Sequence, residues 1–269
     1  NIYVGNSVRV RKISSSGVIG PFAGGGGIGF GGDGGLATVA SFSFIAAIAV
    51  DSLGNVYVAD RDNHRVRRIG TNGVITTVAG NGTAAFTAVP GPGNQRSLDM
   101  PDALAVDADD NLYITDRTSV RRLSRADGTM QTIAGNATNG FSGDGGLAID
   151  ATLYDPSGII VEPDGDILVS DTVNWKIRRI SAGEITTISQ VAGPAAMARD
   201  SAGNVYIVLQ GRNQVGRIKP TGEFGNYAGT GTAGFSGDGG DAVSAMLNAS
   251  AGVAVDTANK LLIADTSNH

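Results

Sequence analysis

The chain has 269 residues, no cysteine and a formal net charge of −5 at pH 7. Without cysteine, neither disulfide bonds nor thiolate chemistry can occur. The acidic balance disfavours a general role in binding phosphate backbones, so nucleic acid is not an expected partner even though basic pairs recur along the chain. No apolar run reaches the ~18 residues that a membrane-spanning helix needs, so no membrane span is expected.

A repeated unit organises the chain, and its clearest copy is NVYVADRDNHRVRRI at residues 55–69. Val56, Val58 and Asp60 alternate with Tyr57 and Ala59, which is the two-residue period of an extended strand. Both sets are mostly apolar, so we expect this strand to be buried on both faces. A polar turn and a further strand over 66–69 follow. Looser copies begin at Asn1, Asn111, Asp166, Asn204 and Leu261.

Two further strands flank each copy. A run of small apolar residues ending in an acid and a tight turn comes before it, as at 47–55 and 103–111. A glycine turn and a Thr/Val-rich run come after it, as at 72–80 and 127–135. Four antiparallel strands about every 50 residues predict an all-β fold, a β-propeller of four-stranded antiparallel blades. Small residues in the first strand suit the narrow space near a propeller axis.

The small acid-ending strand, the Gly-Asn turn, the Tyr-Val-Ala-Asp strand and the turn at Asn63-His64 together resemble the NHL repeat. The resemblance covers nearly the whole chain and implies one propeller domain over residues 1–269. Because the chain starts inside a repeat, we expect it to be trimmed or a segment of a longer protein. A six-bladed ring with incomplete terminal blades is favoured. In the five-bladed alternative, residues 252–256 complete the N-terminal blade. An incomplete ring would expose terminal strand edges, through which copies could assemble.

The loops between units repeat one motif, which reads GFGGDGG at 29–35 and GFSGDGG at 140–146 and 234–240. Each copy holds one acid among glycines: Asp33, Asp144 or Asp238. These carboxylates, among exposed carbonyl groups, could hold Ca²⁺, which takes six to eight oxygens. The favoured alternative is that each acid caps its own loop, because no loop has the closely spaced acids of a dedicated calcium site. The neighbouring phenylalanines are expected to fill the grooves between blades.

The turn residues Asn63 and His64, with Asn174 and Trp175 in the corresponding later turn, are the candidate ligand-binding residues. Trp175 is the only tryptophan, and it could anchor a glycan or a peptide or pack against a neighbouring loop.

Catalysis has little support in the residues. The only histidines are His64 and His269, too few for the multi-histidine zinc site of the lyases that share this propeller type. The residues therefore favour a non-catalytic binding or structural module, which binds a protein or glycan through its inter-blade loop face. The resemblance to secreted bacterial NHL-repeat proteins, together with the low charge density, implies an exported bacterial protein, extracellular or periplasmic. The alternative is a metal-dependent propeller enzyme, a lactonase, lyase or sugar-oxidising enzyme, with its site at the channel mouth.

Overall fold

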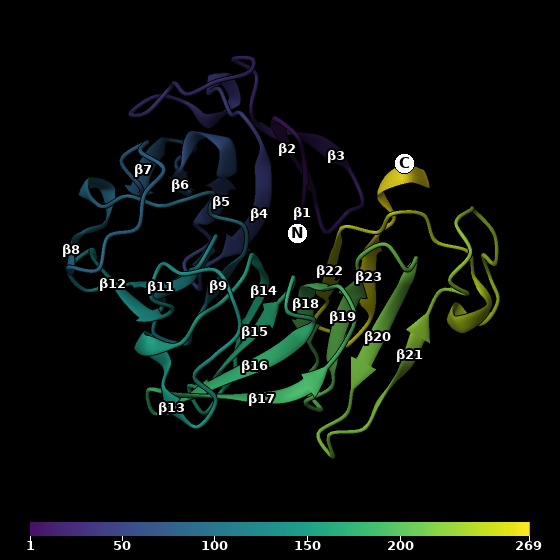
Figure 1. The fold of residues 1–269 in the computed structure, drawn as a ribbon. Coiled ribbons are helices and arrows are strands. Elements are labelled where there is room, and N and C mark those ends of the chain that lie inside the picture. The colour runs from purple at the N-terminus through teal and green to yellow at the C-terminus, as the bar shows by residue number, and fades with distance from the viewer. Residues whose placement is uncertain (269) are drawn as a thin grey trace. The chain divides into compact units, whose positions relative to one another are not determined.

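The computed structural model describes residues 1–268, and its strands pair antiparallel in consecutive sheets (Figure 1). The first sheet holds β1 (Ile2–Asn6), β2 (Arg9–Ile13) and β3 (Ile19–Ala23). The second holds β4 (Ile45–Val50), β5 (Val56–Asp60), β6 (Arg65–Ile69) and β7 (Ile75–Ala79). The third holds β9 (Leu104–Val106), β10 (Leu112–Asp116), β11 (Ser119–Leu123) and β12 (Thr129–Ala134), with β8 (Gly91–Pro92) at its edge.

The fourth sheet holds β14 (Pro156–Val161), β15 (Ile167–Asp171), β16 (Lys176–Ser181) and β17 (Glu184–Gln190), with β13 (Gly146–Leu147) at its edge. The fifth holds β18 (Pro194–Arg199), β19 (Val205–Leu209), β20 (Gln214–Ile218) and β21 (Phe224–Ala228). The last pairs β22 (Gly252–Val255) with β23 (Leu261–Ala264). Within the described residues, five single-turn 3₁₀ helices lie between strands and a sixth follows β23: η1 (Ala37–Val39), η2 (Arg61–Asn63), η3 (Gly93–Gln95), η4 (Ala148–Asp150), η5 (Ala242–Ser244) and η6 (Thr266–Asn268).

The fold is a β-propeller, as the repeat pattern predicts. Within residues 1–268, five sheets have three or more strands, which matches the five-bladed alternative. The two-stranded sheet of β22 and β23 corresponds to the incomplete C-terminal blade that was expected for a six-bladed ring. No helix in the described part of the chain is long and apolar enough to cross a membrane. By internal contacts the chain divides into two compact units, residues 1–138 and the residues from 139 on.

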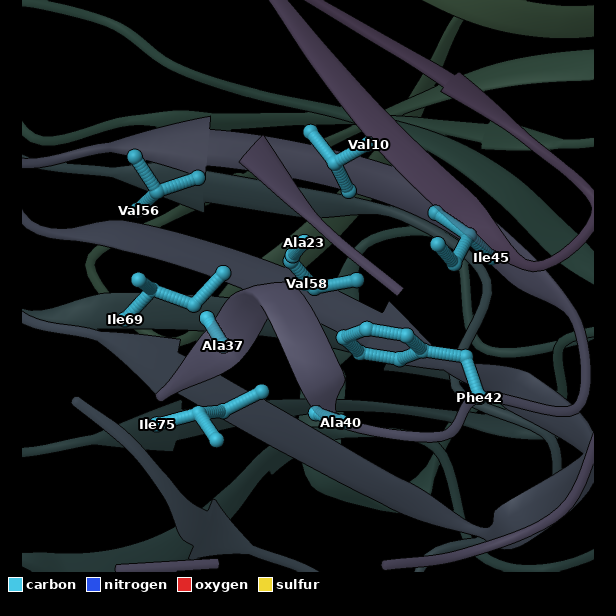
Figure 2. Close-up of a cluster of buried hydrophobic side chains, with 10 residues drawn as sticks. All are labelled: Val10, Ala23, Ala37, Ala40, Phe42, Ile45, Val56, Val58, Ile69 and Ile75. Carbon is cyan, nitrogen blue, oxygen red and sulfur yellow. The ribbon is translucent and has the colours of Figure 1, made fainter. Parts of the chain in front are cut away.

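The second strand of each complete blade is the buried one. Every residue of β5, β10, β15 and β19 is buried, as the apolar character of both faces predicts. In the first unit, side chains of β5, β6 and β7 share an apolar core with β2, β3 and the loop around η1 (Figure 2). The core of this unit thus joins neighbouring sheets and reaches into a loop that leads from one sheet to the next. Its members are Val10, Ala23, Ala37, Ala40, Phe42, Ile45, Val56, Val58, Ile69 and Ile75.

The turns between first and second strands are organised by one acid. Asp51 accepts hydrogen bonds from the backbone N–H of Leu53 and Asn55, from the Asn55 amide and from the Tyr57 hydroxyl. Asp107 and Asp200 hold equivalent turns. The tight turns predicted after the first strands are therefore present, and these acids hold them.

Each complete blade has two ends. The turn between its second and third strands lies at the same end as the loop to the next blade, because the strands alternate in direction. We call this the loop end, and we call the opposite end, with the other two turns, the hairpin end.

Candidate functional site

At the loop end of the second sheet, four polar side chains form one network, the Asp60 network: Asp33, Asp60, Asn63 and Arg67. Asp60 ends β5 and Arg67 lies in β6, and both side chains are fully buried. Arg67 reaches Asp60 Oδ2 through Nη1 at 3.4 Å and Asp33 Oδ1 through Nη2 at 2.6 Å. Asn63 Nδ2 donates to both Asp60 oxygens at 2.9 Å and to the Gly29 carbonyl at 2.8 Å. The network therefore ties the inter-blade loop to the strands.

The fourth sheet repeats this arrangement as the Asp171 network: Asp144, Asp171, Asn174 and Arg178. Arg178, also fully buried, reaches Asp171 at 3.2 Å and Asp144 at 2.9 Å. Asn174 Nδ2 donates to Asp171 and, at 2.7 Å, to the carbonyl of Gly140. In both networks the loop acid and the strand arginine are 34 residues apart, as are the loop glycine and the turn asparagine. This constant spacing is a sequence signal from which the networks could have been predicted.

Within residues 1–268, the third copy of the loop motif makes only the asparagine contacts of the network. Asn268 Nδ2 donates to Asp265 and to the Gly234 carbonyl, again 34 residues away. The position that would correspond to Arg67 and Arg178 falls beyond residue 269. Asp238 is exposed to solvent.

The fifth sheet lacks every member of the network. Leu209 stands where the other blades have Asp60 and Asp171, and Gly216 stands where they have the buried arginine. Phe224 fills the freed space, since a Cβ at Gly216 would lie 2.6 Å from its ring. The preceding link is only Val191 to Gly193, which has no acid. This blade lacks both the strand acid and the strand arginine, and either one alone would be a buried charge without its partner.

The third sheet keeps half of the network. Arg121 pairs with the buried Asp116 at 3.3 Å, but its inter-blade loop has no acid at the position of Asp33. The Thr87 carbonyl and the Thr132 hydroxyl contact Nη1 instead, and the Phe86 ring centre lies 4.5 Å from the guanidinium. Burial lowers the pKa of Arg121, and its pairing with Asp116 opposes that shift.

Burial also raises the pKa of Asp60, Asp116 and Asp171, against the opposing effects of their hydrogen bonds and arginine partners. For each carboxyl, removal from water is the largest effect. All three acids are closed to solvent, so they hold the structure together rather than contact a ligand.

The sequence-predicted ligand residues fall into two groups. Asn63 and Asn174 belong to the networks, so their amide groups hold loops. His64 adopts a left-handed backbone conformation, and its Nδ1 accepts a hydrogen bond of 3.2 Å from the Met100 backbone N–H in the next inter-blade loop. Asn213 accepts an equivalent bond from Ala249. These side chains are therefore occupied within the fold.

Trp175 differs from its counterparts His64 and Asn213. Its backbone is also left-handed, with φ of 58°, which is a strained conformation for a bulky residue. The link that follows its blade, Val191 to Gly193, is too short to cover the ring, and Trp175 remains 56% exposed. Trp175 is therefore an exposed aromatic ring at the loop end of its blade.

Phe30 and Phe141 of the loop motif are about half buried. The Arg65 guanidinium lies 3.8 Å from the centre of the Phe30 ring, and Lys176 lies 4.5 Å from that of Phe141. Phe235, in the third copy, is 70% exposed. The rings of Phe30 and Phe141 also lie 4.8 Å from the buried guanidinium groups of Arg67 and Arg178. These two rings therefore cover the arginines and present apolar surface at the loop end.

Calcium binding by Asp33, Asp144 and Asp238 stays a prediction. In the structure, Asp33 and Asp144 each pair with an arginine. Asp33 Oδ1 accepts from Arg67 and Oδ2 accepts from the backbone and hydroxyl of Thr77. Asp144 pairs with Arg178. Calcium at either loop would therefore have to displace an arginine. The basic pairs that recur along the chain include Arg67, Arg121 and Arg178. Their side chains are buried, and each pairs with the acid that ends the preceding strand.

The family model for the NHL repeat matches residues 42–69, which include β5, the turn at Asn63 and β6. The chain is an NHL-repeat β-propeller. Among curated proteins, Teneurin-1 of Homo sapiens is 30% identical over 250 residues, covering 88% of this chain. The match covers only 8% of Teneurin-1, so the chain corresponds to a small part of that protein.

Solved structures share the propeller fold at low sequence identity. An auxiliary nutrient binding protein from Bacteroides ovatus has a TM-score of 0.67 at 14% identity, covering 99% of this chain and 64% of its own. A gluconolactonase from Xanthomonas campestris has a TM-score of 0.64 at 15% identity, covering 96% and 75%. Proteins with a similar propeller fold thus include one described as nutrient binding and one described as a gluconolactonase.

Proposed function

We propose that this NHL propeller is a non-catalytic binding module that takes a protein or glycan partner at the loop ends of its blades. The observation that carries the proposal is the pairing of rigid loops with exposed aromatic rings. The Asp60 and Asp171 networks fix the loops that display Phe30 and Phe141, and Trp175 stands uncovered on a strained turn. Aromatic and arginine side chains on a preorganised surface are typical of binding hot spots.

The similarity to Teneurin-1 and to a nutrient binding protein supports a binding role. An exported location is part of the proposal and stays a prediction, which fractionation of the native host with an antibody against the chain would test. Assembly through strand edges also stays a prediction, and light scattering of the purified chain would test it.

The test compares aromatic residues at the two ends of the blades. Labelled protein would be screened on a glycan array and against a display library of the host's exported proteins, and affinities would be measured for each ligand found. We expect Trp175→Ser and Phe235→Ser to weaken binding about tenfold or more. Leu53→Ser and Val18→Ser, exposed apolar positions at the hairpin end, are the matched controls and should leave affinity unchanged. Equal losses at both ends would contradict the proposal.

The enzyme alternative has a direct test of its own. Within residues 1–268, the first strands β4, β9 and β22 carry only apolar residues and glycine, and β14 and β18 add only Ser157 and Arg199. These strands supply little for metal ligation or acid-base catalysis. Hydrolysis of gluconolactone that calcium supports and EDTA abolishes would nevertheless establish the enzyme and overturn the non-catalytic proposal.

A further inference from the structure

An open cavity of about 320 Å³ lies at the loop end of the second sheet. Three parts of the first unit meet there: the loop with Phe30 and Asp33, the strands β6 and β7, and the loop after β7. The lining residues are Phe30, Asp33, Arg65, Thr76, Thr77, Gly80, Asn81 and Asn94. The volume is at the lower end of the range for small-molecule sites, which begins at about 300 Å³.

The charged groups beside the cavity are already compensated. Asp33 receives hydrogen bonds from Arg67 and Thr77 on both of its oxygens. Arg65 donates to the carbonyl oxygens of Asn63 and Asn81, both at 2.9 Å. With Asp60, these groups make two arginines against two aspartates, so their formal charges cancel. A neutral ligand therefore fits this cavity better than an ion.

The groups that remain available are neutral and polar. Thr76 and Asn94 are exposed, and within the described residues their side chains have no hydrogen-bond partner. A hydroxyl and an amide can each donate and accept, which is also what a sugar hydroxyl does. Phe30 adds an apolar ring that is 46% exposed, against which the C–H face of a pyranose can pack.

The position of Arg65 fixes the shape of the cavity wall. Its guanidinium lies between the Phe30 ring and Gly82, where a Cβ would be only 2.3 Å from Nη2. Because the arginine is held by two carbonyls and a ring, the wall is formed before any ligand arrives. Preorganisation of this kind reduces the entropy lost on binding.

The second unit contains a natural comparison. Phe141, Asp144 and Thr186 correspond to Phe30, Asp33 and Thr76, but the segment after β17 is only Val191 to Gly193. Nothing in that short link can supply the counterparts of Asn81 and Asn94. The cavity thus depends on the long loop after β7.

We propose that this cavity is a binding site for a neutral pyranose, either a free monosaccharide or one residue of a glycan. The inference rests on the proposed function, because it names a ligand class for the loop end. Thr76 and Asn94 would bond the sugar hydroxyls, and Phe30 would pack against the ring. For a ligand of this size in an open site, we expect a dissociation constant on the order of 1 mM.

The test is titration of the ¹⁵N-labelled chain with glucose, galactose, mannose and N-acetylglucosamine, followed by heteronuclear NMR. We expect at least one sugar to shift the amide signals of Thr76, Thr77, Asn81 and Asn94. Asn94→Ala and Thr76→Val should each weaken binding by up to about tenfold, as expected for one lost hydrogen bond. Thr186→Val, the matched position in the second unit, should leave binding unchanged.

The outcomes separate this inference from the proposed function. Signals that shift only elsewhere, for example at the Trp175 indole, would overturn the cavity as the site and leave a glycan-binding loop end standing. No shift with any of the four sugars would overturn the inference, while the protein-binding part of the proposed function would still rest on the Trp175 and Phe235 variants. Equal weakening by Thr186→Val would also overturn it.

Discussion

Replacing Arg67 by methionine removes the cation that two aspartates share. Asp60 is fully buried and would lose the charge that compensates it, although it would keep the hydrogen bonds from Ser43 and Asn63. Breaking a buried ion pair by removing one partner costs about 3–5 kcal/mol. With a denaturant slope of about 2 kcal/mol/M, we expect the urea midpoint of the first unit to fall by about 1.5–2.5 M.

The double variant Asp60→Asn with Arg67→Met separates a charge effect from a packing effect. Asparagine can still accept from the Ser43 N–H, and no buried charge remains. We expect the double variant to recover at least about 1 kcal/mol relative to Arg67→Met alone, because the two residues contact each other. Arg125→Ala, at an exposed position, is the control and should stay within about 0.5 kcal/mol of the parent. A double variant as unstable as the sum of its single changes would refute the reasoning.

The same comparison predicts a dependence on pH. The pKa of Asp60 is raised in the folded protein by burial, and Arg67 opposes that rise. Between the ordinary aspartate pKa and the raised value, the folded state binds more protons than the unfolded state, so the contribution of Asp60 to stability falls as pH rises. Without Arg67 the pKa rises further. We therefore expect the deficit of Arg67→Met to be larger at about pH 7 than at about pH 4.5. A deficit that is constant over this range would contradict the account.

Three further predictions concern the turns and loops. Trp175→Gly should stabilise the fold by up to about 1 kcal/mol in urea unfolding followed by circular dichroism, because glycine adopts the left-handed conformation without strain; destabilisation would show that the indole packs. Asn174→Ala should cost about 1–3 kcal/mol in the same assay, because Asp171 and the Gly140 carbonyl lose a donor, and an unchanged midpoint would argue against the network. Excess calcium should leave the thermal midpoint where EDTA leaves it, because Arg67 occupies Asp33; a rise lost in Asp33→Ala would revive the calcium site.

The repeat is visible in the amino-acid sequence, and the pattern within the repeat places the strands. The alternation at residues 56–60, the small residues of the first strands and the turn acids Asp51, Asp107 and Asp200 are local signals. Strand period and turn chemistry depend on neighbours in the chain, so a sequence shows them directly. These signals were sufficient for a propeller of NHL type and for the order of its strands.

The roles of the polar residues depend on contacts between segments that are distant in the sequence. In the sequence, Asp33 has no evident partner. In the folded chain, β6 places Arg67 2.6 Å from Asp33, although the two residues are 34 positions apart. The sequence made Asn63 and Asn174 candidate ligand-binding residues. In the structure their side-chain amides donate hydrogen bonds to loop carbonyl groups. Trp175 stays exposed because the next link is short, and the cavity beside Arg65 exists because two loops distant in sequence meet there. Such pairings depend on which blades and loops become neighbours in space, and burial then determines which of the charged groups must find partners.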